Sequence, residues 1–166
     1  KGQSESGAGD SGAGNVEEGE RREEFSPHVV GDWILAQQHI HQHPYTGALP
    51  GGWSWTERSG GVPDVDDTSA ALLALRAVID QRDMAEPSQP GPVATATDTP
   101  SGSASEEQVY LAASLGSDWL LKIQNDDGGW PTFCRGWGKL PFDRSGADLT
   151  AHAIRALNCW KDPVAT

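Results

Sequence analysis

The chain of 166 residues holds 24 Asp and Glu against 12 Lys and Arg, a formal net charge of -12, and its length suits one modest domain. It has no Lys/Arg cluster that could form a phosphate-binding surface, which argues against a nucleic-acid partner. No apolar run is long enough to cross a membrane as a helix, and none has the pattern of a signal peptide.

Two segments have a composition that is typical of disorder. Residues 1–24 are rich in Gly, Ser and Glu, and residues 85–108 are rich in Pro, Ser and Thr. Such sequences bury too little apolar surface to offset the entropy lost on ordering. We therefore predict a disordered acidic tail at 1–24 and a domain at 25–166 that carries a disordered insert at 85–108.

Four segments have the apolar periodicity of α-helices, and none predicts a strand. The predicted helices are residues 28–40, 67–82, 109–124 and 149–161. In the second helix the apolar residues at steps of three and four are Leu72, Leu75, Val78 and Ile79. In the fourth, Thr150, Ile154 and Leu157 share one face, and Asp148 is placed to cap the helix. The chain is therefore predicted to be all-α.

From the end of the first predicted helix onward, His39, His41 and His43 alternate along the chain as the ligands of a metal site can. No Cys or carboxylate joins them locally, so we favour a polar turn and predict no metal site. Cys134 and Cys159 lack the spacing of a disulfide framework or a metal motif, which favours a reducing, cytoplasmic compartment.

Three acids, Asp64, Asp66 and Asp67, stand directly before the second helix. One interpretation is a helix cap with extra charges that complement the helix dipole. The other is catalytic, because clustered carboxylates resist simultaneous ionisation and one of them then keeps its proton. The acids alone leave both interpretations open.

The helices belong to a unit that occurs twice. Its first copy contains DWILAQQ (32–38), GGW (51–53) and DDTSAALLALRAV (66–78). Its second copy contains DWLLKIQ (118–124), GGW (128–130) and ADLTAHAIRALNCW (147–160). Each copy predicts a helix, a Gly-Gly-Trp turn and a second helix. Because repeat architectures stack several such units, we predict that the chain is part of a larger structure.

The segment LGSDWLLKIQNDDGGW (115–130) resembles the QW motif of triterpene cyclases. The matching residues of the second copy are Trp119, Leu120, Gln124, Gly128 and Trp130, although the opening Lys/Arg of the motif is missing. The first copy matches more loosely, through Trp33, Ile34, Gln38, Gly51 and Trp53. In that family the Gln amide and the Trp ring lock the turn between two helices. The resemblance thus implies an all-α fold that is part of an α/α toroid (an α6-α6 barrel) built from helix-turn-helix repeats with such turns.

Two further segments resemble squalene-hopene cyclases. PDVDDT (63–68) is similar to their DxDD acid motif, and DLTAH (148–152) is similar to their Asp-x-Thr-Ala-His segment. GGWSW (51–55) resembles the aromatic turn before the acids. The resemblance covers about residues 28–161 and only part of a family member, and it is loose over RGWGKLPFDRSGA (135–147), which leaves the role of Cys134 open.

The resemblance implies a class II terpene cyclase, an isomerase that protonates a terminal alkene of squalene or a related polyprenoid and needs no cofactor. Asp66 would be the proton donor, with Asp64 and Asp67 as its neighbours and His152 as its hydrogen-bond partner. Asp148, one helical turn before His152, is expected to orient the imidazole ring.

The resemblance implies that two aromatic rings contact the substrate, Trp55 and Phe133. The negative face of an aromatic ring stabilises a carbocation in a site that excludes water. Members of the family are associated with membranes, so the resemblance also implies peripheral membrane contact for the intact protein.

Two other functions compete with the cyclase. A protein prenyltransferase β-subunit shares the toroid, but it needs a zinc-binding Asp-x-Cys where this chain has Asp64-Val65-Asp66. A non-catalytic repeat scaffold would keep the Gln and Trp turns and bind partners or lipids.

Overall fold

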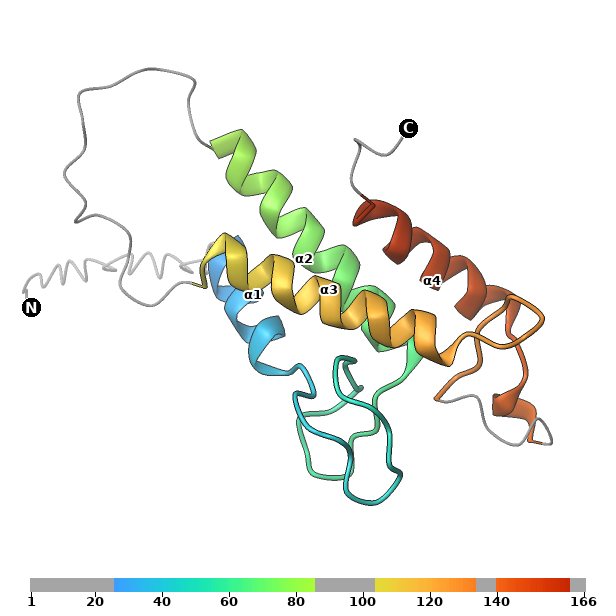
Figure 1. Cartoon of the computed structure of the whole chain (residues 1–166). Helices are drawn as coiled ribbons and strands as arrows, with labels where there is room; N and C mark the ends of the chain where they lie inside the picture. Colours follow the sequence, from blue (N-terminus) through green and yellow to red (C-terminus); the bar gives the residue numbers. More distant parts are fainter. Residues whose placement is uncertain (1–25, 86–103, 134–139, 162–166) are drawn as a thin grey trace, which may run out of the picture.

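A computed structural model describes residues 26–85, 104–133 and 140–161 (Figure 1). The predicted acidic tail lies outside these ranges. Residues 86–103 of the predicted insert and Cys134 lie outside them as well.

The described residues form four α-helices, one short 3-10 helix and no strand, which confirms the all-α prediction for this part of the chain. The elements are α1 (Pro27–Ala36), α2 (Val65–Ala85), α3 (Glu106–Ile123), η1 (Pro141–Asp143) and α4 (Ala147–Cys159). Within the same ranges, no helix is both long enough and apolar enough to span a membrane.

The first helix ends earlier than predicted. α1 stops at Ala36, although its periodicity predicted a helix to residue 40. Beyond it, the N–H of His39 donates to the carbonyl of Gly52 at 3.0 Å, and the N–H of Gly51 donates to the carbonyl of His39 at 2.7 Å. These two bonds pair the chain with the Gly-Gly turn, and a helical backbone could not make them.

The third helix begins earlier than predicted. Ser105 caps α3, because its hydroxyl accepts the N–H of Gln108 while the Gln108 side chain accepts the N–H of Ser105. Residues 104–108, which composition assigned to the disordered insert, are therefore ordered, and the last three of them begin this helix.

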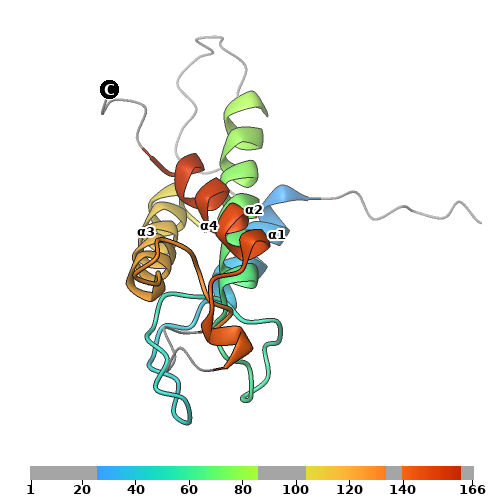
Figure 2. The same ribbon diagram turned by 90° about the vertical axis from the view of Figure 1, so that its right-hand side faces the viewer.

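Helix α2 lies at the centre and packs against the other three helices (Figures 1 and 2). Both views place the loop between α1 and α2 at the same end of the helices as η1, and α2 and α4 begin at this end. The apolar residues of α2 that were predicted to face the core are all buried, namely Leu72, Leu75, Val78 and Ile79.

The predicted face of α4 is wrong at one position. Ala153 and Ala156 are the buried residues of this helix, whereas the side chain of Ile154 is 46% exposed. Alanines let α4 approach α2 closely, and this packing turns Ile154 outward.

The two copies of the unit have the same hydrogen bonds around their Trp residues. In the first, the Trp53 indole N–H donates to the Ile34 carbonyl at 2.7 Å, and its backbone N–H donates to the Thr68 hydroxyl at 2.9 Å. In the second, the Trp130 indole donates to Leu120 at 2.9 Å and its backbone N–H to Thr150 at 3.1 Å. Each Trp thus fastens its turn to the helix before it and to the helix after it.

The glutamines of the two copies donate hydrogen bonds at the same turns. Gln38 donates to the carbonyl of Gly51 at 2.8 Å, and Gln124 donates to that of Gly128 at 2.7 Å. Both glycines have positive φ, 117° at Gly51 and 87° at Gly128, a conformation that residues with a Cβ rarely adopt. The repeat seen in the sequence is therefore a repeat of the backbone as well.

Candidate active site

The acid cluster lies at the N-terminus of α2. Asp64 is only 5% exposed, and its carboxylate accepts the N–H of Asp67 at 2.8 Å, as a helix cap does. Its own N–H donates to the carbonyl of Trp53 at 3.0 Å, so the Gly-Gly-Trp turn holds it in place. The capping interpretation of the acids therefore applies to Asp64.

The environment of Asp64 keeps a proton on this cluster. Burial has the largest effect on Asp64 and raises its pKa to about 8, together with the side-chain hydrogen bond of Asp67 and the charges of Asp67 and Asp66. The hydrogen bond from the Asp67 backbone N–H lowers this pKa in part. Asp64 is thus largely a neutral acid at pH 7. The clustered acids were expected to include one that retains its proton, and Asp64 is the residue whose surroundings do this.

Asp66 contacts a residue that is far away in the sequence. The Nδ1 atom of His152 on α4 lies 2.7 Å from Oδ1 of Asp66, and the Asp66 side chain is 67% exposed while that of His152 is 27% exposed. The shared proton can lie on the imidazole, which then donates to a carboxylate, or on the carboxyl, which then donates to Nδ1. The structure thus brings together the two residues that the resemblance paired.

Asp148 does not join this contact. It is exposed in the first turn of α4, and within the described ranges no hydrogen bond links it to His152. Gly146 holds the cap position of α4, so the expected cap by Asp148 is wrong. The His152 ring contacts Asp66 on α2, and this contact gives no support to an orienting role for Asp148.

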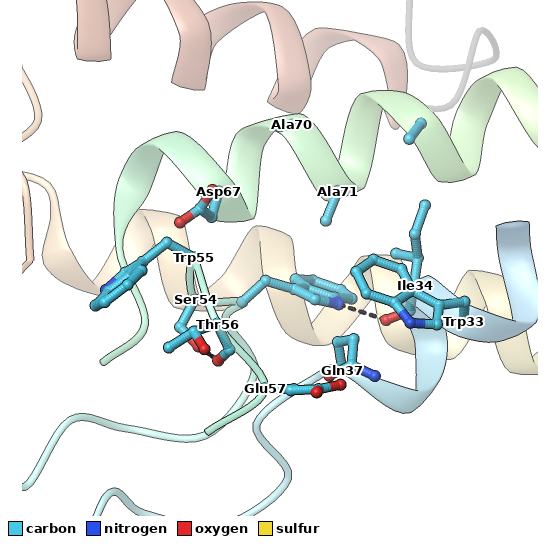
Figure 3. Close-up of a pocket in the computed structure, with 12 residues that line it drawn as sticks. Trp33, Ile34, Gln37, Ser54, Trp55, Thr56, Glu57, Asp67, Ala70 and Ala71 are labelled. Atoms are coloured by element: carbon cyan, nitrogen blue, oxygen red, sulfur yellow. Dashed lines mark hydrogen bonds between the residues drawn. The ribbon is translucent and has the colours of Figure 1, made fainter. Parts of the chain in front are cut away.

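A cavity of about 540 Å³ opens beside the cluster (Figure 3). Asp67 lines it from the start of α2, and the turn contributes Trp53 and Trp55, whose side chain is 71% exposed. Trp33 of α1 lines the cavity on the side opposite Trp55 (Figure 3). Asp66 is not among the lining residues, so this cavity reaches the cluster through Asp67.

Phe133 lies in a different cavity, of about 450 Å³. Its ring meets that of Phe142 edge to face, with centroids 6.2 Å apart, and Trp119 lines the same space. Phe133 and Trp55 were both expected to contact substrate, and they line these two different cavities.

Phe142 is an aromatic residue that no pattern in the sequence predicted as part of a site. It precedes α4 in a segment that resembles the family only loosely, so no motif marks it. The only signal in the sequence is the run Leu-Pro-Phe-Asp shortly before the helix. Its packing against Phe133 in the structure is what places it at this cavity.

The three histidines form part of the turn after α1. Nε2 of His39 is 2.9 Å from the Ser54 hydroxyl, and Nδ1 of His43 accepts the N–H of Thr46 at 3.3 Å. Burial and the nearby His43 lower the pKa of His39. Within the described residues, no group of three or more His, Cys, Asp or Glu side chains is arranged to hold a metal ion.

Comparisons with known proteins give a consistent group of relatives, although no protein-family model matches the chain. A probable squalene-hopene cyclase of Sinorhizobium fredii (strain NBRC 101917 / NGR234) is 25% identical over 141 residues, which are 78% of this chain and 17% of that protein. The terpene cyclase-glycosyl transferase fusion protein fsoA of Humicola fuscoatra is 30% identical over 123 residues, 67% of this chain and 7% of that protein. The squalene hopane cyclase afumA of Aspergillus fumigatus (strain CBS 144.89 / FGSC A1163 / CEA10) is 26% identical over 144 residues, 80% of this chain and 15% of that protein.

These similarities confirm the resemblance to squalene-hopene and terpene cyclases. They cover most of this chain, but the chain spans less than a fifth of the length of each of these relatives.

Proposed function

We propose that this chain is part of a class II terpene cyclase, which closes the rings of squalene or a related polyprenoid after protonating a terminal alkene. The observation that carries the proposal is the hydrogen bond between Asp66 and His152, next to the buried acid Asp64. The relatives named for squalene or terpene cyclisation support the substrate class. Four helices cannot enclose a chain of that length, so the proposal places them in the wall of an α/α toroid with further helix-turn-helix units.

Asp66 is the proton donor in this mechanism. The π electrons of the alkene form a bond to the carboxyl proton, which leaves a carboxylate on Asp66 and a tertiary carbocation on the substrate. His152 donates a hydrogen bond to that carboxylate, and the N-terminus of α2 favours its negative charge. Because Asp64 is largely neutral at pH 7, it places little negative charge beside Asp66.

Trp55 is proposed to stabilise the cation. The negative face of an indole can contribute about 2 kcal/mol to a cation when water is excluded. The ring and Asp67 both line the first cavity (Figure 3). Since it is exposed in this chain, the complete toroid must cover it. The proposal includes Phe133 as a second aromatic contact, reached across the second cavity.

A cytoplasmic location and peripheral membrane contact of the intact protein belong to the same proposal, because a polyprenoid substrate is dissolved in membranes. A non-catalytic repeat scaffold is the second candidate, and the exposure of Asp66 and Trp55 favours it. A prenyltransferase subunit remains the weaker enzyme alternative, since Asp66 occupies the position of its zinc-binding Cys.

The test compares turnover of squalene in detergent by the longest polypeptide that contains this sequence and by its Asp66→Asn variant. The amide keeps the shape of the side chain but has no acidic proton. Asp118→Asn, an exposed acid on α3, is the matched control. Cyclised product from the parent and the control, but not from Asp66→Asn, would support the proposal. A well-folded polypeptide that turns over neither squalene nor shorter polyprenoids would favour the scaffold.

A further inference from the structure

The loop segment that carries Trp55 is fixed firmly just before this residue. Trp53 is buried, its backbone N–H donates to the Thr68 hydroxyl at 2.9 Å, and its carbonyl accepts the Asp64 N–H at 3.0 Å. The side chain of Trp55 is 71% exposed, so packing does little to hold it. A ring that stabilises a cation has to keep its face toward the substrate. Hydrogen bonds of the neighbouring residues are the means that remain.

One such hydrogen bond spans Trp55. The hydroxyl of Ser54 donates to the carbonyl of Thr56 at 2.9 Å, and so joins the residue before Trp55 to the residue after it. The three residues lie together on the loop at one side of the first cavity (Figure 3). A bond between a serine hydroxyl and the nearby backbone restricts the dihedral angles of the residue that it encloses. The bond therefore limits the directions in which the Trp55 side chain can leave the backbone.

The imidazole of His39 completes this chain of hydrogen bonds. Its Nε2 atom lies 2.9 Å from Oγ of Ser54. The hydroxyl has one hydrogen, which it gives to the Thr56 carbonyl, so its oxygen accepts the second bond and Nε2 of His39 carries the proton. Burial and the nearby His43 lower the pKa of His39, which favours the neutral ring. His39 is thus a donor that fixes the position of the Ser54 hydroxyl.

The backbone of His39 is anchored to the same turn. Its N–H donates to the carbonyl of Gly52 at 3.0 Å, and its carbonyl accepts the N–H of Gly51 at 2.7 Å. The other two histidines differ, because His43 accepts from Thr46 and His41 is exposed. His39 is therefore the histidine of this turn that connects the end of α1 to the segment of Trp55.

Gly61 covers the bond that spans Trp55. This glycine is buried, and an added Cβ would lie 2.5 Å from the Thr56 carbonyl oxygen and 2.6 Å from Oγ of Ser54. A hydrogen bond shielded from water is stronger than one that competes with solvent. The loop thus protects the bond although the Trp55 ring itself is exposed.

We propose that His39 and Ser54 are positioning residues for Trp55, which hold its ring toward the first cavity. The inference rests on the proposed cyclase activity and extends it, because neither residue has a role in the resemblance to cyclases. Without these bonds the backbone of Trp55 would sample other conformations, and the ring would stabilise the carbocation less.

Nuclear magnetic relaxation of the Trp55 backbone amide, measured on this chain, tests the positioning itself. We expect an order parameter of about 0.85 in the parent and below about 0.6 in Ser54→Ala and in His39→Phe. His39→Gln places an N–H where Nε2 of the imidazole lies, and should restore the order. His41→Phe changes an exposed histidine of the same turn and is the matched control. The amide of Trp53 should stay rigid in every variant, which shows that the fold is intact.

An order parameter of Trp55 that is the same in the parent, Ser54→Ala and His39→Phe would overturn the proposal. So would a failure of His39→Gln to restore the order that His39→Phe loses.

Steady-state kinetics of the longest polypeptide that contains this sequence tests the link to catalysis. Ser54→Ala should lower kcat by about 10-fold and change KM little. In a Trp55→Leu background the same substitution should have no further effect, because no ring is left to position. Equal losses of kcat in the two backgrounds would overturn the proposal. A parent that cyclises nothing would refute the proposed cyclase, whereas the relaxation data would still decide whether His39 and Ser54 hold Trp55.

Discussion

His152 and Asp66 lie 86 positions apart in the sequence, yet Nδ1 of one is 2.7 Å from Oδ1 of the other. The contact joins the first turn of α2 to α4, and therefore joins the two repeated units at the end of the molecule where both helices begin. A carboxyl in this position has a hydrogen-bond partner and a helix N-terminus, which both stabilise its ionised form. These are the properties that a strong proton donor needs after it has given up its proton.

Replacing His152 should slow cyclisation without abolishing it. His152→Ala removes the partner that stabilises the Asp66 carboxylate but leaves the acidic proton, so we expect kcat to fall by about 100-fold. The change in KM should be small, because His152 contacts the acid and not the bulk of the substrate. Steady-state kinetics of the longest available polypeptide, with Asp118→Asn as the control, measures both. A loss confined to KM would contradict the assigned role.

The buried Asp64 should make stability depend on pH. Its pKa is raised from 3.8 to about 8 on folding, so the folded state holds a proton that the unfolded state has lost between these values. The free energy of unfolding should therefore fall as the pH rises from about 4 to about 8 and level off above. Asp64→Asn copies the neutral acid and should be more stable than the parent at about pH 9, by several kcal/mol, with little difference at about pH 4.

Urea unfolding at both pH values measures this difference. Asp118→Asn serves as an exposed control and should shift the curves equally at the two pH values. Equal effects of Asp64→Asn at the two pH values would show that Asp64 ionises normally in the folded chain.

The hydroxyl of Thr68 should be needed for stability. It is fully buried, accepts the backbone N–H of Trp53 at 2.9 Å and donates to the Trp53 carbonyl at 3.3 Å. Thr68→Val keeps the shape but leaves that N–H without a partner, which should lower the free energy of unfolding by about 1–3 kcal/mol. Thr150→Val, the counterpart at a less buried turn, should have a smaller effect. Chemical denaturation compares the two, and a larger loss from Thr150→Val would refute this account of the turns.

Gly116 should tolerate no side chain. An added Cβ would lie 2.7 Å from the buried Trp53 ring and 3.2 Å from Leu72, so α3 would have to move away from the first repeated unit, which is α1, its turn and α2. We expect Gly116→Ala to destabilise the fold by about 1–3 kcal/mol. Gly60→Ala is the control, because a Cβ there meets nothing within 4 Å, and it should be nearly neutral. Similar melting temperatures for both variants would mean that the two units are packed more loosely than described.

The features that could be predicted from the sequence are those that depend on residues close together in the chain. The helices, the Gly-Gly-Trp turns and the buried residues of α2 follow from periodicity and from the conformational freedom of glycine. The contact of His152 with Asp66 was expected only through the resemblance, because no local pattern relates residues so far apart.

Other features depend on long-range packing and were missed for that reason. α1 ends at Ala36 because the following residues pair with a turn beyond the loop. Ile154 is exposed because α4 packs on α2 through alanines, a choice that periodicity does not reveal.

Isotope labelling of the product tests proton-initiated cyclisation most directly. The proton on Asp66 exchanges with solvent, so a polypeptide that contains this chain, incubated with squalene in D2O, should transfer deuterium to carbon in the first step. The cyclised product should then carry one deuterium that does not wash out, and Asp66→Asn should give no product. A cyclised product without deuterium, or one formed equally well by Asp66→Asn, would contradict the proposal that Asp66 starts the reaction.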